Sequence, residues 1–306
     1  LDPPPPPRDF VPSPQLGFPD IEVLRSLSKQ YKERSAVSTD GFHMRHFSFL
    51  SDEALVCLRE LYIIMEISSL IPVQMYMIVS MLLPKPVGGF RPIGVFTAPY
   101  RLWGKVRRPL AQAWERYNHR PWYAAGKCMG ATDTVWRQAL LSEGGVAAGQ
   151  CAVTLLWDFL KYYETLNIGQ VLDRCARHGF PVSIARLACY AYRAPRHISL
   201  DGCLSAAMFA VFGIVAGCPF ATTFIRINSP DGLDSVRWHP RINYSLYIDD
   251  NGIHGVGSYK DVFAGIVDGS RQLHRVITDD IGATLAADKA VLLTSNRAPG
   301  EDIRAL

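Results

Sequence analysis

Two adjacent acidic residues, Asp249 and Asp250, lie between two short apolar runs at 242–247 and 253–256. Alternating runs joined by a segment that ends in Asn-Gly, here at 251–252, predict a β-hairpin, because Asn and Gly tolerate the positive φ of a tight turn. Acidic residues are common in solvated turns, but the apolar flanks predict that a buried sheet holds this tip. Carboxylates held there suit divalent-metal binding, provided that a further carboxylate arrives from a neighbouring strand.

Asp158 is the candidate for that further carboxylate. It ends the apolar run 151–157, which predicts a buried strand. An Asp at such a position is also typical of a helix cap or a turn. Paired with the Asp249 hairpin, it is a candidate half of a two-metal site. Phosphoryl transfer uses such carboxylates to hold metal ions about 4 Å apart that bridge the attacking and leaving oxygens.

The composition is that of a globular protein with a sizeable core. The chain has 306 residues, 48% hydrophobic and 20% charged, enough for about two domains or one bilobal domain. It begins with Leu1 rather than Met, so we expect a segment of a longer protein with flanking domains. Seven cysteines without a Cys-x-x-Cys pair argue against a disulfide framework or a zinc site and suit a reducing, intracellular compartment, nuclear or cytoplasmic.

The amino-terminal half reads as a leader followed by helices and a hairpin. Residues 1–19 form a Pro-rich leader that we expect to be extended and unpacked. Helices are predicted over 20–34 and from a cap at Ser51 towards Ser69. An apolar strand candidate, 75–83, then leads into a basic hairpin with Gly88-Gly89 as its turn.

The stretch 204–225 is apolar, uncharged and long enough to span a membrane. It contains Gly213, Gly217 and Pro219, and no cluster of Lys or Arg lies on one side of it. We therefore predict a buried strand, turn and helix here, and no membrane partner.

Positive charge is concentrated in residues 101–120, whose net charge of +5 exceeds the +4 of the whole chain. Aromatic residues are interleaved with these charges. A solvated helix face is one interpretation. The other is a surface that follows a phosphate backbone and stacks on bases. The candidates for nucleic-acid binding are Arg101, Lys105, Arg107 and Arg108.

The order of six blocks from residue 35 to about 296 resembles the reverse transcriptase domain of non-LTR, LINE-type retroelements, with group II intron reverse transcriptases as relatives. Each block alone is weakly specific, but they occur in the family's order over most of the chain. The blocks are Ser38-Thr39-Asp40-Gly41, Pro84-Lys85 with Phe90-Arg91-Pro92-Ile93, Tyr123 to Thr134, Asp158 to Glu164, Gly213 to Phe220, and Tyr247-Ile248-Asp249-Asp250 with a following Leu285 to Lys289.

The resemblance implies a catalytic role for four residues. Asp158, Asp249 and Asp250 would bind two Mg²⁺ ions, for which Mn²⁺ could substitute. Because successive strand residues point to opposite faces, Asp250 is expected to be the less direct ligand. Lys289 would lie near the pyrophosphate leaving group as a general acid, or it is simply a surface lysine after a strand.

The resemblance also implies a nucleotide-binding set. Lys85 and Arg91 would hold the incoming triphosphate, where Arg offers a bidentate phosphate contact; the alternative is that they only keep the hairpin soluble. Tyr163 would block a ribose 2′-hydroxyl, or it is a core aromatic. Gly217 would let the backbone approach the template and the nascent base pair, and Ala216 lies beside it.

Three departures from the family pattern leave alternatives open. Ala216 stands where the family usually carries Gln, Glu164 replaces an Asp, and Tyr162 replaces a small residue. These changes are compatible with a catalytically decayed, nucleic-acid-binding remnant. An RNA-dependent RNA polymerase is a further alternative, although the Tyr-x-Asp-Asp block and Tyr163 favour deoxynucleotides.

The resemblance therefore implies an α+β right-hand polymerase fold, with an antiparallel palm sheet and packed helices and with the thumb missing or truncated. Residues 20–150 would be the fingers lobe, 151–296 the palm and 297–306 a tail. The implied reaction is attack of a primer 3′-hydroxyl on the α-phosphate of a dNTP. The implied partners are an RNA template, a DNA primer and dNTPs.

Overall fold

The computed structural model describes residues 16–86, 88–126 and 129–295. Most of the predicted leader and all of the predicted tail lie outside these residues. The described end of the leader is packed, contrary to the prediction: the Phe18 and Tyr62 ring centroids are 5.7 Å apart. Within the described part, no helix is both long and apolar enough to cross a membrane.

The chain forms two compact units, and each is assembled from two separate stretches. Unit 1 combines Leu1–Tyr117 with Leu166–Ile227, and unit 2 combines Asn118–Thr165 with Asn228–Leu306. The predicted fingers and palm ranges are contiguous, so they do not coincide with these units. The assignment of fingers and palm roles stays a prediction.

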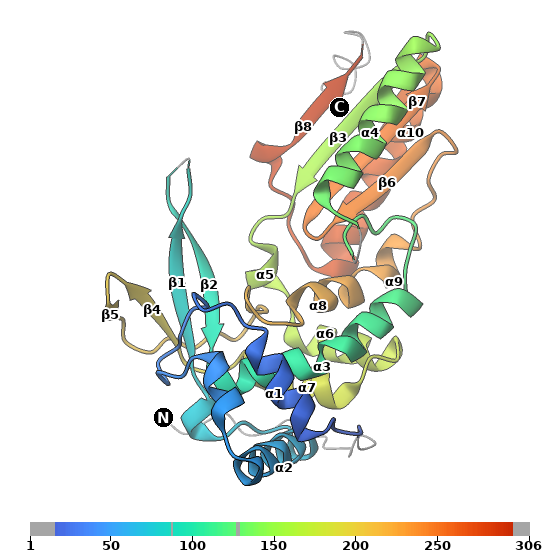
Figure 1. Ribbon diagram of the computed structural model, residues 1–306. Helices are drawn as coiled ribbons and strands as arrows, with labels where there is room; N and C mark the ends of the chain where they lie inside the picture. The colour runs from blue at the N-terminus through green and yellow to red at the C-terminus, as the bar shows by residue number, and fades with distance from the viewer. Residues whose placement is uncertain (1–15, 87, 127–128, 296–306) are drawn as a thin grey trace. The chain divides into compact units, whose positions relative to one another are not determined.

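Unit 1 contains a mixed sheet and many of the helices (Figure 1). Its helices are α1 Ile21–Lys29, α2 Asp52–Ser68, α3 Ala98–Tyr117, α6 Ile168–Arg177, α7 Val182–Ala191 and α8 Ala221–Asn228, with 3₁₀ helices η1 Met44–Phe49 and η2 Val73–Met75. Its strands are β1 Ile78–Pro84, β2 Phe90–Phe96, β4 Arg196–Leu200 and β5 Cys203–Leu204, in the order β2-β1-β4-β5.

The starts of two helices follow from their caps. Asp20 accepts a hydrogen bond from Ile21 N at the start of α1, and the Ser51 hydroxyl accepts one from Ala54 N at the start of α2, as predicted for Ser51. The first helix is shorter than the predicted 20–34. It ends at Lys29.

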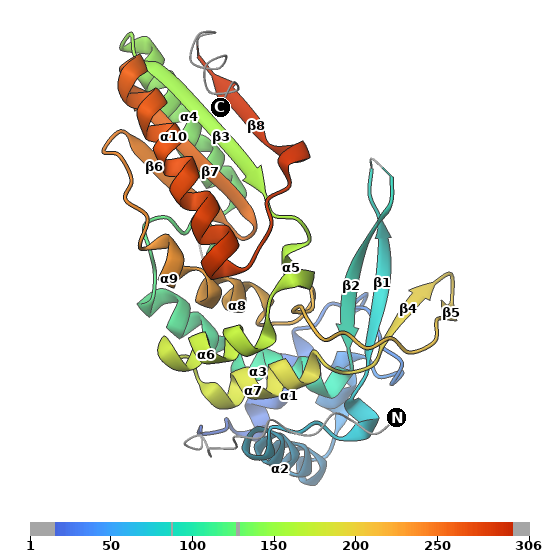
Figure 2. The ribbon, with the colours of Figure 1, turned by 180° about the vertical axis from the view of Figure 1, so that it is seen from behind.

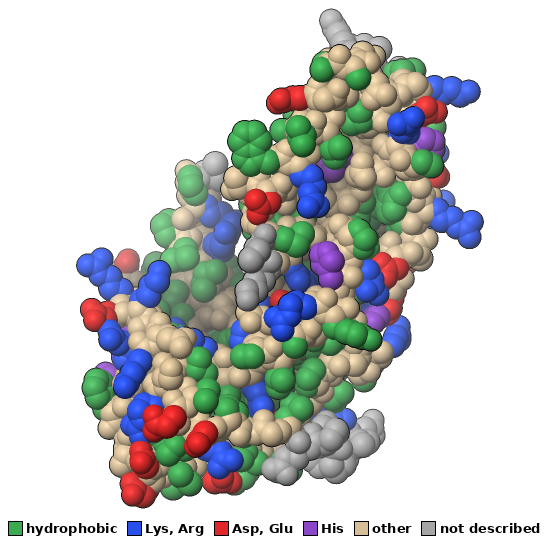
Figure 3. Space-filling model, turned by 45° about the vertical axis from the view of Figure 1, so that its right-hand side comes forward, with side chains coloured by type: hydrophobic (Ala, Val, Ile, Leu, Met, Phe, Trp, Pro, Cys, Tyr) green, Lys and Arg blue, Asp and Glu red, His purple; other side chains and the backbone are tan. Residues whose placement is uncertain are grey.

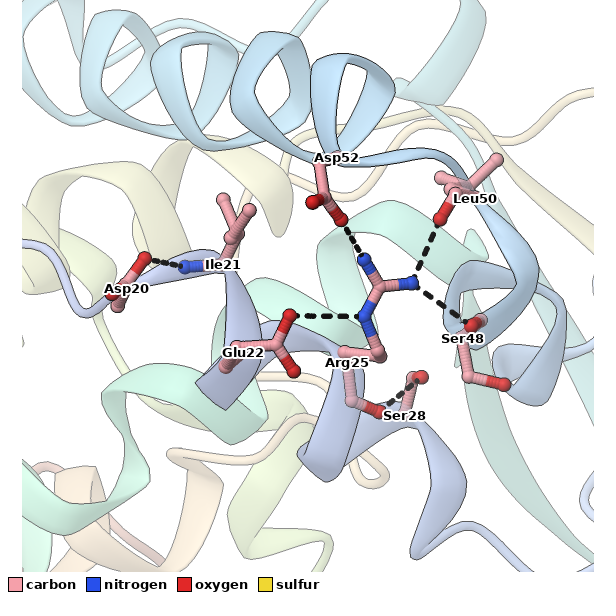
Figure 4. Close-up of polar contacts among 8 residues, drawn as sticks. All are labelled: Asp20, Ile21, Glu22, Arg25, Ser28, Ser48, Leu50 and Asp52. Carbon is pink, nitrogen blue, oxygen red and sulfur yellow. Dashed lines mark hydrogen bonds and ion pairs between the residues drawn. The ribbon is translucent and has the colours of Figure 1, made fainter.

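Arg25 fastens α1 to the segments that follow it (Figure 4). Its guanidinium donates to the carbonyl oxygens of Ser48 (3.3 Å) and Leu50 (2.8 Å), to Glu22 on its own helix (3.2 Å) and to Asp52 at the start of α2. The planar fork of donors lets one side chain satisfy carbonyls at the end of η1 together with two carboxylates.

The predicted basic hairpin is present as β1 and β2. The two strands are antiparallel, and the turn places Gly88 at φ 91° and Gly89 at φ 79°, a backbone region that favours glycine. The first strand begins at Ile78 rather than Met75, because residues 73–75 form η2 instead.

Large aromatic side chains fill the core of unit 1, including the fully buried Trp103, Tyr62, Tyr100, Tyr192, Phe180, Phe220 and Phe224. The apolar stretch 204–225 contributes to this core only at its carboxyl-terminal end. Residues 201–209 are exposed, while Ile214, Val215 and Phe220 are buried and lead into α8. The predicted helix is therefore present, whereas the strand is limited to β5, which is short and exposed.

Unit 2 is built around an antiparallel sheet in the order β6-β7-β3-β8. Figures 1 and 2 show α4 against one face of this sheet and α10 against the other. The elements are β3 Cys151–Asp158, β6 Ile242–Tyr247, β7 Asp250–Gly257, β8 Val291–Thr294, α4 Ala131–Ala147, α5 Tyr162–Thr165, α9 Pro230–Leu233 and α10 Tyr259–Arg275, with a π-helical segment η3 Val276–Ile281 and the 3₁₀ helix η4 Ala287–Lys289.

Alternation along the strands of unit 2 decides which helix each side chain meets. Thr154 and Leu156 border a cavity with α4, whereas Leu155 and Trp157 border a cavity with α10. Cross-strand partners share a face, so Asp158 and Asp250 continue the α4 face at the end of β3. The fold thus brings two of the predicted acidic residues to one side of one sheet.

Candidate catalytic site

The acidic site lies where β3 ends beside the start of β7. In the antiparallel register, Asp158 is the direct partner of Asp250. Like charges directly opposite each other destabilise a sheet, so this pairing has a cost that apolar residues in the same places would not incur. Each of the two residues stands at the end of a strand whose other residues are largely buried.

The hairpin that carries Asp249 has a tighter turn than predicted. Tyr247 pairs directly with Asp250, so the turn consists of Ile248 and Asp249, and Asn251 and Gly252 belong to β7. The predicted hairpin is therefore present, but its predicted Asn-Gly turn is wrong.

Ile248 in this turn has φ 61°. A β-branched residue in the left-handed region costs on the order of 1–3 kcal/mol. The buried ladder of β6 and β7 must hold the turn in this conformation, because the local sequence does not favour it. Asn251 helps: its buried amide oxygen accepts a hydrogen bond from the Tyr244 hydroxyl (2.6 Å), and its amide nitrogen donates to the carbonyl of Asp249 (3.3 Å).

The expectation that Asp250 is the less direct ligand rested on strand alternation between Asp249 and Asp250. That argument does not apply, because Asp249 is a turn residue and only Asp250 is on the strand. The register instead gives Asp250 the position opposite Asp158. The order in which the three carboxylates would contact a metal stays a prediction.

Residues 284–289, near the end of the described chain, place Lys289 at this site. Leu160 N donates to Thr284 O (2.7 Å), and Ala286 N donates to Asp158 O (2.9 Å), so residues 284–286 run beside the end of β3. The turn of η4 then places Lys289 Nζ 2.5 Å from Asp158 Oδ2. A lysine predicted from the sequence therefore contacts a predicted carboxylate.

The proximity of these groups shifts their pKa values. Burial first, and the charge of Asp158 second, raise the pKa of the Asp250 carboxyl, while Lys289 opposes them. The hydrogen bond from Lys289 to Asp158, followed by the charge of that carboxylate, raises the pKa of the ammonium. In this arrangement Lys289 holds its proton firmly, and its role as a general acid stays a prediction.

Tyr163 is part of this neighbourhood, whereas its neighbour Tyr162 is a core residue. Tyr162 is 2% exposed, and its ring centroid is 4.3 Å from that of Phe159. Tyr163 is half-buried, and burial, with the nearby charge of Asp249 as the next cause, raises its pKa to about 12. The hydroxyl therefore stays neutral near a carboxylate.

The donor set suits a hard cation. Within the described residues, no group of three or more His, Cys, Asp and Glu side chains is arranged to hold a metal ion by itself. Mg²⁺ is usually held by one or two carboxylates together with substrate phosphates and water. Carboxylates from β3 and from the β6–β7 hairpin fit such a site, and Asp158 and Asp249 remain the predicted ligands with Asp250.

The predicted triphosphate-binding residues belong to unit 1. Arg91 is exposed on β2 opposite Leu83, and Lys85 is exposed at the turn, where its N–H and C=O bond the backbone of Gly89 and Gly88. The carboxylates belong to unit 2. The role of Lys85 and Arg91 stays a prediction.

The structure requires glycine at position 217 for a reason that the sequence did not suggest. Its φ is 109°, and a Cβ there would overlap the carbonyl oxygen of Gly94 on β2. Gly94 N donates to Ala216 O at 2.7 Å. The close approach that Gly217 permits in this structure is to the β2 backbone, and its contact with a template stays a prediction.

The basic residues of α3 are engaged within unit 1. Arg107 is 2% exposed and binds both carboxylate oxygens of Glu66 at 2.6 Å, so the prediction that it contacts nucleic acid is wrong. Arg108 contacts Glu115 (3.0 Å) and the Thr223 hydroxyl (2.7 Å).

The other two predicted nucleic-acid contacts also have partners in the fold. Lys105 Nζ donates to Leu27 O (3.0 Å) and lies 4.1 Å from the centroid of the Tyr31 ring. Arg101 donates to Ala36 O (2.5 Å). The nucleic-acid contacts of Arg101, Lys105 and Arg108 stay predictions. Glu66, the buried partner of Arg107, could not be identified from the sequence, since it resembles any other acidic residue of an amphipathic helix.

Comparison with known proteins gives a likeness of fold. No family model matches the chain, and no curated protein matches it in sequence. Among solved structures, it is similar to apo telomerase from Candida tropicalis, truncated from its C-terminal domain. The TM-score is 0.53 at 15% sequence identity, over 74% of this chain and 52% of that chain. The chain thus spans about half the length of the telomerase chain that it matches.

The chain has a reverse-transcriptase-like polymerase fold. This likeness supports a polymerase-like fold of mixed helices and strands, and it does not single out non-LTR elements or group II introns. The predicted right-hand arrangement of fingers and palm stays a prediction.

Proposed function

We propose that this chain is the polymerase segment of a retroelement polyprotein and performs RNA-directed DNA synthesis. The observation that carries the proposal is the meeting of Asp158, Asp250 and Lys289 at the end of one antiparallel sheet, with Asp249 in the adjoining turn. The fold likeness to telomerase supports a nucleic-acid polymerase of the nucleotidyltransferase kind.

The proposed reaction is attack of a primer 3′-hydroxyl on the α-phosphate of a dNTP, with release of pyrophosphate. Asp158, Asp249 and Asp250 would hold Mg²⁺ or Mn²⁺. A divalent cation held there would supply positive charge that neutralises the phosphates and the charge developing in the transition state. The chain's own contribution is to fix carboxylates on a rigid sheet, where no reorganisation is needed at the moment of reaction.

Other residues would select and orient the nucleotide. Lys289 would hold a proton near the leaving group. Tyr163, neutral and half-buried beside Asp249, would exclude a ribose 2′-hydroxyl. Lys85 and Arg91 would bind the triphosphate as donors on an exposed hairpin, and exposure leaves their donors open to a ligand.

Primer extension tests the proposal. We expect the chain to extend a DNA primer on an RNA template with dNTPs in Mg²⁺, and Asp158→Asn to reduce the rate by at least about 10³-fold, the scale of a single preorganised electrostatic group. The matched control is Asp268→Asn, because Asp268 is an exposed carboxylate on α10 of the same unit.

The outcomes separate the three candidate functions. Extension with NTPs but not dNTPs would identify an RNA-dependent RNA polymerase. Binding of primer–template without any extension would identify the catalytically decayed alternative, to which the Ala216 departure points. Extension that survives Asp158→Asn would refute the two-metal assignment.

A further inference from the structure

Unit 2 contains a cavity of about 420 Å³ between α4, the segment before it and the strands β6 and β7. Its lining includes Trp122, Trp136, Arg137, Gln138, Ser245 and His254. None of Asp158, Asp249, Asp250 and Lys289 lines the cavity. Its volume lies within the range of ordinary small-molecule sites.

Two tryptophans border the cavity. Trp122 is held in place: its Nε1 donates to Asp234 Oδ1 (3.0 Å), and its ring centroid is 4.2 Å from that of Tyr123. Trp136 on α4 is 71% exposed, and neither a hydrogen bond nor a ring contact fixes it among the described residues. Indole rings at a cavity wall offer faces on which a planar ligand can stack.

A chain of hydrogen bonds leads from α4 into the cavity. Gln138 Nε2 donates to Thr154 Oγ1 (3.0 Å), and this buried hydroxyl is also hydrogen-bonded to His254 Nδ1 (3.3 Å). The other ring nitrogen, His254 Nε2, is hydrogen-bonded to Ser245 Oγ (3.1 Å). Burial lowers the pKa of His254 to about 4, so the ring is neutral at pH 7.

Two charged side chains lie at the cavity, and they differ in whether a partner within the protein already binds them. Asp133 also lines it, but its Oδ2 accepts the N–H of Gly130 (2.8 Å). Arg137 is exposed and has no ion-pair partner among the described residues. A free guanidinium at the rim of a cavity suits a phosphate.

We propose that this cavity binds one unpaired nucleobase, with the phosphate of the same nucleotide at Arg137. Stacking surfaces, a serine hydroxyl, a side-chain amide and a free guanidinium together match the flat face, the polar edge and the phosphate of a nucleotide. The choice of ligand rests in part on the proposed function, because a polymerase handles single-stranded nucleic acid. The site is separate from the carboxylates of nucleotidyl transfer.

The test measures binding of AMP, CMP and ribose 5-phosphate by saturation-transfer NMR titration in EDTA, where binding that depends on a divalent cation is absent. We expect both nucleotides to bind the whole chain and its Asp158→Asn variant, and ribose 5-phosphate to bind neither. Trp136→Ala should weaken AMP binding by about tenfold or more, the usual effect of removing a stacking aromatic.

The matched control is Leu140→Ala, because Leu140 is a similarly exposed apolar residue on α4 (75%) that does not line the cavity. Arg137→Gln should weaken AMP binding and leave adenosine binding unchanged. Equal effects of Trp136→Ala and Leu140→Ala, binding of ribose 5-phosphate as strong as that of AMP, or no nucleotide binding would each overturn the proposal. Nucleotide binding without primer extension would refute only the proposed polymerase activity, and extension without nucleotide binding in EDTA would refute only this cavity.

Discussion

The buried His254 should make the protein sensitive to mild acid. Its side chain is 7% exposed and hydrogen-bonded to two hydroxyls, on Ser245 and Thr154, and burial lowers its pKa to about 4 from the ordinary value of 6.5. Between about pH 4 and pH 6.5, His254 is largely protonated in the unfolded chain and largely neutral in the folded chain. Protonation therefore favours unfolding, and the free energy of unfolding must fall as pH falls through this window.

The size of this effect follows from the two pKa values. Taking 6.5 unfolded and about 4 folded, the free energy of unfolding should fall by about 2 kcal/mol between pH 7 and pH 5, and by about 3 kcal/mol once the pH is well below 4. Above about pH 7.5 the histidine is neutral in both states and contributes almost no pH dependence.

Urea unfolding at pH 7.5, 6 and 5, followed by circular dichroism, measures this loss. The comparison is between the wild type and His254→Gln, which removes the titrating ring, with His119→Gln as the control, because His119 is exposed. We expect the stability difference between wild type and His254→Gln to shrink or reverse by about 2 kcal/mol from pH 7.5 to pH 5. A difference that stays constant over this range would show that His254 accepts a proton in the folded protein. The assignment of His254 as a neutral, hydrogen-bonded ring would then be wrong.

The other predictions concern the core, a tight turn and sugar selection. Glu66→Gln should lower the free energy of unfolding by about 3 kcal/mol in urea, because it leaves the buried Arg107 without its counter-charge; a loss below about 1 kcal/mol would mean that water reaches the pair. Gly217→Ala should destabilise more than Gly202→Ala in thermal melts, because both have positive φ but only the first would overlap backbone atoms; equal losses would argue against that close approach. If the proposed function holds, Tyr163→Val should raise the use of ribonucleotides relative to dNTPs in primer extension, and an unchanged ratio would return Tyr163 to a packing role.

Local sequence was enough to locate the main pieces of the site. The apolar run before Asp158 is long and contains no turn residue, so it predicts a buried strand that ends at the carboxylate, as observed. The alternating residues around Asp249 likewise predict a hairpin, and Ser51 predicts the start of α2. These signals depend on neighbours within a few positions, which the sequence shows directly.

The tertiary structure decided what the sequence left open. The turn lies at 248–249 rather than at Asn-Gly because the pairing of β6 with β7 holds a β-branched residue at positive φ, against its local preference. The contact of Lys289 with Asp158 depends on a segment more than a hundred residues away in the chain.

The two compact units make the same point for the whole chain, because each joins stretches that are distant in sequence. Arginine is usually a surface residue, yet Arg107 is buried and paired with the carboxylate of Glu66 on another helix. His254, Thr154 and Gln138 form one hydrogen-bonded chain from three different elements. Residue types and local periodicity determine which elements form, but the burial and the partners of a polar side chain depend on which distant segments pack around it.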